Sequence, residues 1–134
     1  MTIVVDSSVV VAALIDSGPA GTWAESMLLS GHLAAPHLLI VEAANILRRM
    51  AATGQISDDV ATLAHEDLVS MRVELFPYGP CARRVWALRS NLTAYDAWFV
   101  ALAESLRATL VTLDARLTRA TGPRCDFAVP SAPR

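Results

Sequence analysis

The chain has 134 residues and a formal net charge of −2 at pH 7, and 54% of its residues are hydrophobic, which fits one folded domain and argues against intrinsic disorder. All 11 basic residues are arginine, which excludes the active-site lysine of P-loop and Schiff-base enzymes, and two cysteines without paired spacing argue against a zinc site or a disulfide framework. The apolar runs are too short for a membrane span and no basic leader precedes them, so we expect a cytoplasmic protein that does not contact a membrane.

Strands and helices alternate in the first half of the chain. The β-branched run before Asp6 is typical of a short buried strand, and apolar residues recur on one side of the segment that ends before Gly54. In chain order, the pattern predicts a strand over 2–5, helices over 7–15 and 20–29, a weaker strand over 33–35 and a long helix over 38–52.

The alternation continues in the second half. Ser57 is an expected N-cap, and Thr93 followed by Asp96 resembles a capping box. The pattern predicts a helix from Ser57 to about residue 70, a strand over 73–76, helices over 80–89 and 93–106, a strand over 109–113, a short helix over 115–120 and a strand over 127–129. This order predicts an α/β fold with a mostly parallel sheet in one domain over residues 1–130, followed by a loose tail over 131–134.

Four acidic residues are expected to meet at one edge of this sheet. Asp6 and Asp114 follow predicted strands, and ligands bind beyond the carboxyl ends of parallel strands. Asp96 and Glu42 lie near the beginnings of predicted helices, which point toward the same edge. The four carboxylates therefore form a candidate pocket.

Each acid taken alone also has a structural explanation. Asp6 and Asp114 suit the N-cap position of the helices that follow them, and Asp96 suits a capping box with Thr93. Glu42 lies too far into its helix to cap it, and a partly buried acid needs a partner. Asn45, one helical turn away, is a candidate for a hydrogen bond to Glu42 or to a water molecule.

Carboxylates gathered in one pocket repel one another, and a hard divalent cation relieves that repulsion. Mg²⁺ and Mn²⁺ prefer oxygen ligands and also bind phosphate oxygens, whereas no histidine or cysteine cluster favours zinc here. Such an ion promotes attack of water on a phosphodiester. The acids thus indicate metal-dependent phosphodiester hydrolysis.

The segments around the four acids resemble those of PIN-domain ribonucleases, and among them the VapC-type toxins of bacterial toxin–antitoxin pairs. The similar segments, in family order, are Ile3–Val9, Glu42–Arg49, Thr93–Ala97 and Val111–Leu117. The resemblance implies a three-layer α/β/α sandwich and an endoribonuclease that depends on Mg²⁺ or Mn²⁺. It also implies a homodimer that a small cognate antitoxin neutralises.

The resemblance further implies roles for individual residues. Asp6, Glu42, Asp96 and Asp114 would hold the metal and activate water. Ser8 and Thr112 would orient a carboxylate or water, although each also suits an ordinary helix-start or strand position. The two apolar segments Val9–Leu14 and Trp23–Leu29 would form a groove for the antitoxin.

Arginine takes the place of lysine in any contact with the RNA backbone. The candidates for RNA binding are Arg116, Arg119 and Arg49. Arg83, Arg84 and Arg89 are equally compatible with a solvated face. Trp23, Trp86 and Trp98 favour packing in the core or an interface over stacking on bases.

Three other functions are compatible with parts of the pattern. A haloacid-dehalogenase-type phosphatase would need an acid where Ser8 stands, and a metal-free ribonuclease would use His32 and His37 as acid and base. The non-enzymatic alternative is a PIN-like protein-interaction module whose acids only cap helices.

Overall fold

The computed structural model describes residues 1–131, so residues 132–134 of the predicted tail lie outside the described part of the chain. The elements are β1 (Thr2–Val5), α1 (Ser7–Ile15), α2 (Pro19–Leu28), β2 (His32–Pro36), α3 (Leu38–Ala52), α4 (Asp58–Ser70), β3 (Glu74–Phe76), η1 (Gly79–Cys81), α5 (Ala82–Ala87), α6 (Ala94–Leu106), β4 (Thr109–Val111), α7 (Ala115–Thr118) and β5 (Phe127–Ala128). Within residues 1–131, no helix is both long enough and apolar enough to cross a membrane.

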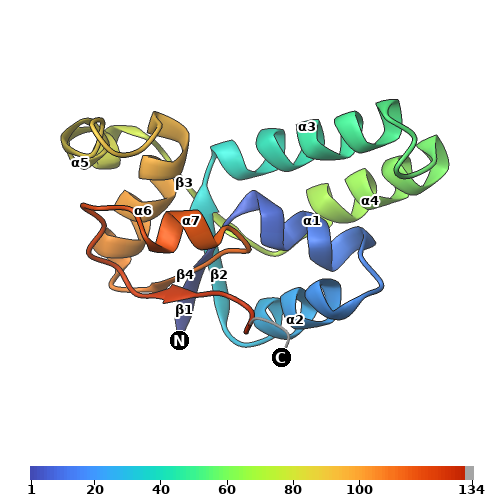
Figure 1. Ribbon diagram of the computed structural model, residues 1–134, viewed down its shortest axis with the longest axis horizontal. Coiled ribbons are helices and arrows are strands. Elements are labelled where there is room, and N and C mark those ends of the chain that lie inside the picture. Colours follow the sequence, from blue (N-terminus) through green and yellow to red (C-terminus); the bar gives the residue numbers. More distant parts are fainter. Residues whose placement is uncertain (132–134) are drawn as a thin grey trace.

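The strands form one sheet in the order β3-β2-β1-β4-β5, and every neighbouring pair is parallel. The first strand of the chain is therefore the central one (Figure 1). Its register places Val4 between Ala34 of β2 and Leu110 of β4. All three side chains are fully buried, which explains why the strand sequence is continuously apolar.

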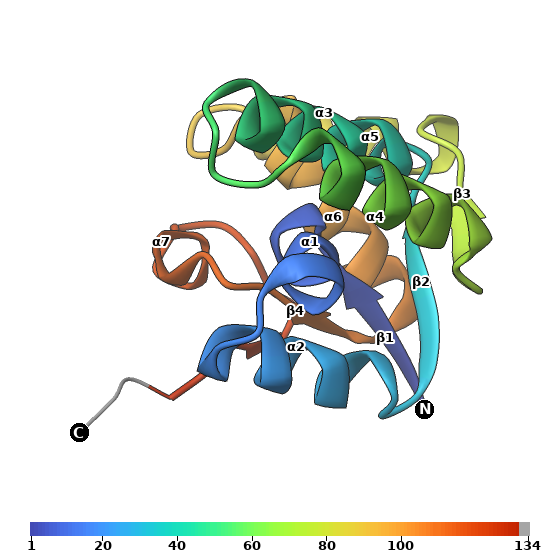
Figure 2. The same cartoon turned by 90° about the vertical axis from the view of Figure 1, so that its right-hand side faces the viewer.

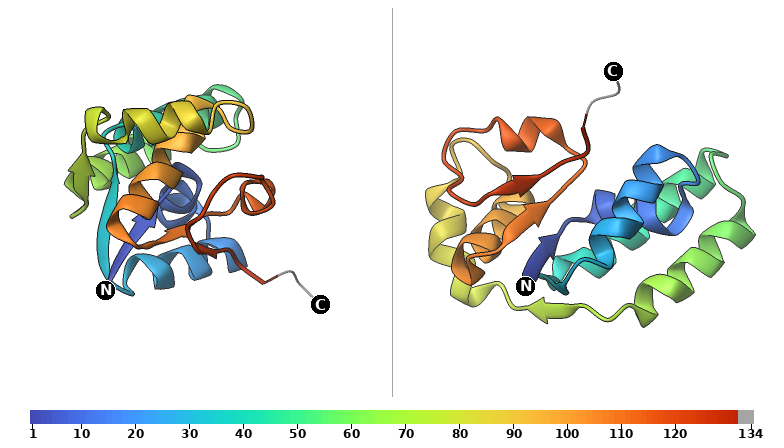
Figure 3. Two further views of the ribbon diagram at one scale, coloured as in Figure 1. Left: turned by 90° about the vertical axis from the view of Figure 1, so that its left-hand side faces the viewer. Right: turned by 90° about the horizontal axis from the view of Figure 1, so that it is seen from below.

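Helices cover both faces of the sheet, as the predicted α/β/α sandwich requires. In the right-hand view of Figure 3, β1 lies between α6 on one side and α1 with α2 on the other. α6 packs against β1, β2 and β4, and α1 packs against α2, α3 and α4. Figure 2 shows α3 and α4 stacked above α1, so the helical hairpin lies beside the carboxyl end of β1.

Several predicted boundaries were wrong. The expected helix over 80–89 is divided into η1 and the short α5. The strand expected over 109–113 ends at Val111, because the N–H of Leu113 donates to Ser8 Oγ (3.2 Å) instead of continuing a ladder. The weak strand expected over 33–35 is longer than predicted, and it pairs with two neighbours.

Gly21 has a steric reason to be glycine. It lies in the first turn of α2, and a Cβ atom there would lie 1.8 Å from the carbonyl oxygen of Asp16. Asp16 is the C-cap of α1, so the missing side chain lets the two helices follow each other closely.

Replacement Gly21→Ala should lower the free energy of unfolding by about 1–3 kcal/mol, because the backbone at Asp16 has to move to make room. Urea denaturation would measure the loss. Gly79→Ala is the matched control, since a Cβ there meets nothing within 4 Å. Equal losses in the two variants would contradict the steric explanation.

Candidate active site

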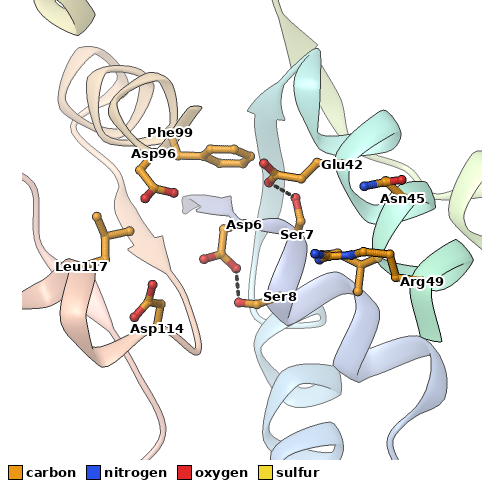
Figure 4. A pocket seen from close by; sticks show the side chains of 11 residues that line it. Asp6, Ser7, Ser8, Glu42, Asn45, Arg49, Asp96, Phe99, Asp114 and Leu117 are labelled. Atoms are coloured by element: carbon orange, nitrogen blue, oxygen red, sulfur yellow. Dashed lines mark hydrogen bonds between the residues drawn. The ribbon is translucent and has the colours of Figure 1, made fainter. Parts of the chain in front are cut away.

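A cavity of about 460 Å³ lies at the carboxyl end of the central strands. All four predicted acids line it, each from a different part of the chain: Asp6 after β1, Glu42 on α3, Asp96 in the first turn of α6, and Asp114 after β4 (Figure 4). The other lining residues are Ser7, Ser8, Asn45, Ile46, Arg49, Phe99 and Leu117. The predicted convergence of the carboxylates is thus present in the structure.

Asp6 is held by hydrogen bonds on both carboxylate oxygens. Oδ1 accepts from Ser8 Oγ (2.6 Å) and from the N–H of Val9 (3.2 Å), and Oδ2 accepts from Thr112 Oγ1. Burial raises the pKa of Asp6, and the hydrogen bonds from Ser8 and Thr112 oppose that rise. Asp6 therefore serves as the N-cap of α1 and also lines the cavity.

The same two hydroxyls connect Asp6 to the chain that carries Asp114. Thr112 Oγ1 accepts from the N–H of Asp114 (3.0 Å), and Ser8 Oγ accepts from the N–H of Leu113 (3.2 Å). Thr112 is fully buried, so its hydroxyl has no access to solvent and is satisfied within this network. The contacts expected of Ser8 and Thr112 as orienting groups are both found.

Glu42 has a partner that sequence reasoning missed. Its Oε1 accepts a hydrogen bond from the hydroxyl of Ser7, a residue that is only 2% exposed. The alternative hydrogen bond from Asn45 to Glu42 is not formed: Asn45 Oδ1 accepts from Arg48 Nε (2.9 Å), and the residue still lines the cavity, so its contact with a water molecule stays a prediction. The available signal was the placement of Ser7 beside Asp6, since Ser7 and Ser8 are the two polar residues at the start of a helix that is apolar from Val9 onward.

Asp96 and Asp114 lie at the beginnings of two helices. Thr93 Oγ1 accepts from the N–H of Asp96 (3.2 Å) as the N-cap of α6, and Asp114 caps α7 by accepting from the N–H of Arg116 (3.0 Å). Desolvation raises the pKa of Asp96, and the charge of Asp114 raises it further. A position at the cap of a helix, for Asp114, or in its first turn, for Asp96, is therefore compatible with a place in the cavity.

The acidic side chains bring negative charge into the cavity, but they do not stand close enough together to form a metal-binding cluster. Desolvation raises the pKa of Glu42, and the charges of Asp96 and Asp6 act in the same direction. Among residues 1–131, no three acidic, histidine or cysteine side chains stand close enough together to hold a metal ion. The acidic groups that line the cavity are all carboxylates, a donor type that suits Mg²⁺ or Mn²⁺, but their side chains would have to move inward to share one ion.

The predicted RNA-binding arginines occupy different places. Arg49 lines the cavity. Arg116 lies outside it, 86% exposed, with Nε 3.4 Å from Asp114 Oδ1. Arg119 is exposed at the C-cap of α7. Arg84 is not on a solvated face, since it pairs with Glu104.

The tryptophans differ from one another. Trp23 packs against the core, and Trp98 meets Tyr78 edge to face with ring centroids 5.2 Å apart. Trp86 is 66% exposed and carries the Arg89 guanidinium 4.8 Å from its ring centroid, so it is not packed in the core, and its expected place in an interface stays a prediction.

Removing one negative charge from the cavity should stabilise the metal-free protein at neutral pH. Folding raises the pKa values of Asp6, Glu42 and Asp96 above the values near 4 that these groups have in the unfolded chain. Their protonated forms therefore stabilise the folded state at low pH, and this stabilisation is lost as pH rises through the raised pKa values. Glu42→Gln keeps an acceptor for Ser7 and should raise the free energy of unfolding at pH 7 by up to about 1 kcal/mol.

Urea denaturation with a chelator at pH 5 and pH 7 would measure this gain. Glu66→Gln, at an exposed position on α4 outside the cavity, is the control. A Glu42→Gln protein that is less stable than wild type at pH 7 would contradict the electrostatic interpretation.

Comparison with known proteins identifies the family of the chain. The model of the PIN domain family matches residues 3–123. Ribonuclease VapC9 of Mycobacterium tuberculosis is 36% identical over 127 residues, which cover 95% of this chain and 97% of that protein.

Solved structures share the fold. The crystal structure of PAE2754 from Pyrobaculum aerophilum superposes with a TM-score of 0.67 at 26% identity, covering 87% of this chain and 77% of that one. VapBC-5 from Mycobacterium tuberculosis, a member of the VapBC family of toxin-antitoxin systems, gives a TM-score of 0.59 at 18% identity and covers 96% of both chains. The predicted family is confirmed: this chain belongs to the PIN domain family and, within it, is homologous to the VapC ribonucleases.

Proposed function

We propose that this protein is a metal-dependent endoribonuclease that hydrolyses RNA phosphodiester bonds and acts in the cytoplasm as the toxin of a toxin–antitoxin pair. The observation that carries the proposal is the cavity lined by four carboxylates at the carboxyl end of the sheet. It occurs in a chain that is 36% identical, over 95% of its length, to a protein named as a ribonuclease.

Asp6, Glu42, Asp96 and Asp114 are the proposed ligands of Mg²⁺ or Mn²⁺. Desolvation raises the pKa values of Asp6, Glu42 and Asp96, and neighbouring negative charge adds to the rise at Glu42 and Asp96; a divalent cation would relieve both effects. Such an ion supplies positive charge for the scissile phosphate and lowers the pKa of water.

Other residues of the chain orient the acidic groups. Ser8 and Thr112 fix both oxygens of Asp6, so this carboxylate is pre-oriented at the end of a rigid strand. Ser7 holds one oxygen of Glu42, which leaves the other oxygen to accept a proton from the attacking water.

One of the three candidate arginines lies in the cavity, and the other two lie outside it. Arg49 lines the cavity and is the proposed contact for the phosphate next to the cleaved bond, since guanidinium groups bind phosphate through paired hydrogen bonds. Arg116 and Arg119 are exposed on and after α7, where they are proposed to contact RNA farther along the strand.

An apolar cavity beside the acidic one is the proposed binding site for an antitoxin. Its apolar lining comes from α1, from α3 and from the segment that follows α3: Val11, Ala12, Ile15, Ile46, Met50 and Ile56. The expectation from the sequence was a groove formed by Val9–Leu14 and Trp23–Leu29; the cavity proposed here shares α1 with that groove and takes α3 as its other side. Ser8 and Arg49 line both cavities, so a segment bound here would lie next to the acids.

Replacement of the acids should abolish RNA cleavage without unfolding the protein. Asp6→Asn and Asp96→Asn should each lower cleavage of total RNA by at least about 100-fold, because each removes a charged ligand while conserving shape. Cleavage by the wild type should stop in EDTA, resume with Mg²⁺ or Mn²⁺, and leave 5′-phosphate ends.

Asp59→Asn, at an exposed position on α4, is the control for this experiment. Circular dichroism would verify that each variant folds. Unchanged cleavage in folded Asp6→Asn protein would reject the site, and cyclic 2′,3′-phosphate ends would indicate a metal-free reaction.

We also propose that the protein is a homodimer. In this proposal a second subunit covers three exposed side chains on α3, α5 and α6: Val41 at 70%, Trp86 at 66% and Tyr95 at 62%. Light scattering at micromolar concentration should give twice the chain mass, and Trp86→Glu should shift it toward the monomer. A wild-type monomer would refute the dimer.

A further inference from the structure

An ion pair joins α5 to α6 at a distance from the acidic cavity. Arg84 Nε lies 2.7 Å from Glu104 Oε1, and Arg84 Nη2 lies 3.1 Å from Glu104 Oε2. The side chains are only 28% and 15% exposed. This two-pronged, partly buried geometry is the kind that contributes most among ion pairs.

Each partner of the pair also binds the backbone of the segment between α7 and β5. Arg84 Nη2 donates to the carbonyl oxygen of Gly122 (2.8 Å), and the N–H of Arg124 donates to Glu104 Oε2 (2.7 Å). Burial opposes ionisation of Glu104, but the hydrogen bonds from Arg84 and Arg124 outweigh it, and the pKa of Glu104 is lowered. The carboxylate therefore remains charged at neutral pH.

The bound segment also lies tightly against the end of α5. Gly122 has φ +115°, a conformation that favours glycine, and a Cβ there would lie 3.0 Å from Leu88 Cδ2. The backbone is thus held by two hydrogen bonds at a place where a larger residue than glycine would press on Leu88.

This segment, which we call the return segment, leads from α7 back to β5, and α7 is the single helical turn that Asp114 caps. Before α7, Thr112 and Ser8 bind the chain to Asp6. Within α7, Leu117 is buried in the core. After α7, the contacts to Arg84 and Glu104 supply the second anchor. Asp114 therefore lies on a short element fastened on both sides.

The second anchor opposes a repulsive force. Asp96 belongs to α6, the same helix that carries Glu104, and the negative charge of Asp114 acts on Asp96 across the cavity. Fastening the return segment to α6 keeps α7 beside that helix, although the acids at the beginnings of the two helices repel each other.

We propose that the Arg84–Glu104 pair is a positioning element that fixes the return segment of residues 119–126 and so holds Asp114 opposite Asp96 for joint binding of a divalent cation. This inference rests on the proposed function, because it gives the two acids a common ion. Neither Arg84 nor Glu104 touches the cavity. Loss of the pair should weaken metal binding without removing a ligand.

The test uses Arg84→Ala and Glu104→Ala in the full chain, with Val85→Ala as the control. Val85 lies on α5, is 2% exposed, and makes no part of the ion pair, so its replacement weakens helix packing alone. Hydrogen exchange of residues 112–126 and binding of Mn²⁺ followed by electron paramagnetic resonance are measured for each protein.

Both Ala variants should exchange amide hydrogens at 119–126 at least about tenfold faster than wild type and should bind Mn²⁺ about tenfold more weakly. Val85→Ala should lose stability but bind Mn²⁺ as wild type does. If the Ala variants fail to fold, Arg84→Gln and Glu104→Gln, which keep neutral hydrogen-bonding groups, should give the same changes to a smaller degree.

Ala or Gln variants that bind Mn²⁺ as tightly as wild type would overturn the positioning role. So would a Val85→Ala protein that loses Mn²⁺ affinity to the same extent, because general destabilisation would then explain the effect. A wild-type protein that binds no Mn²⁺ would instead overturn the proposed function itself, and with it the positioning role.

Discussion

The hydrogen bonds to the carboxylate of Asp6 are the interaction on which the site depends. Asp6 ends the central strand of the sheet, where burial raises the free energy of its charged form. Ser8 and Thr112 compensate for that burial, and both hydroxyls also bind the chain that leads to Asp114. The buried carboxylate of Asp6 needs these hydrogen bonds, and they tie the end of β1 to the segment after β4. Strand β4 therefore ends at Val111.

The carboxylates near Asp6 bring negative charges together, and this arrangement lowers the stability of the folded protein. Four carboxylates line one cavity in a chain whose formal net charge is only −2, so the negative charge is concentrated and not spread. Raised pKa values at three of them show that the folded state works against their ionisation. Proteins keep such arrangements at functional sites, where stability is given up for a pre-oriented set of groups.

Local sequence signals predicted most of the elements because their causes are local. Thr93 and Ser57 cap the helices that follow them, and the β-branched first strand is buried as expected. Errors occurred where distant residues decide the outcome. The N–H of Leu113 binds a serine 105 positions away, and the hydrogen-bond partner of Glu42 is Ser7 on another helix, whereas Asn45 binds Arg48.

The order and spacing of Asp6, Glu42, Asp96 and Asp114 were readable from the chain itself, since parallel strands and the helices after them bring their ends to one edge. Which groups complete the arrangement was decided only by tertiary contacts. Ser7 on Glu42, and Arg84 with Glu104 on the return segment, are pairs 35 and 20 residues apart with no spacing rule that links them. Hydrogen bonds and ion pairs need distances near 3 Å, and only the packing of α1 on α3 and of α5 on α6 brings these side chains within reach.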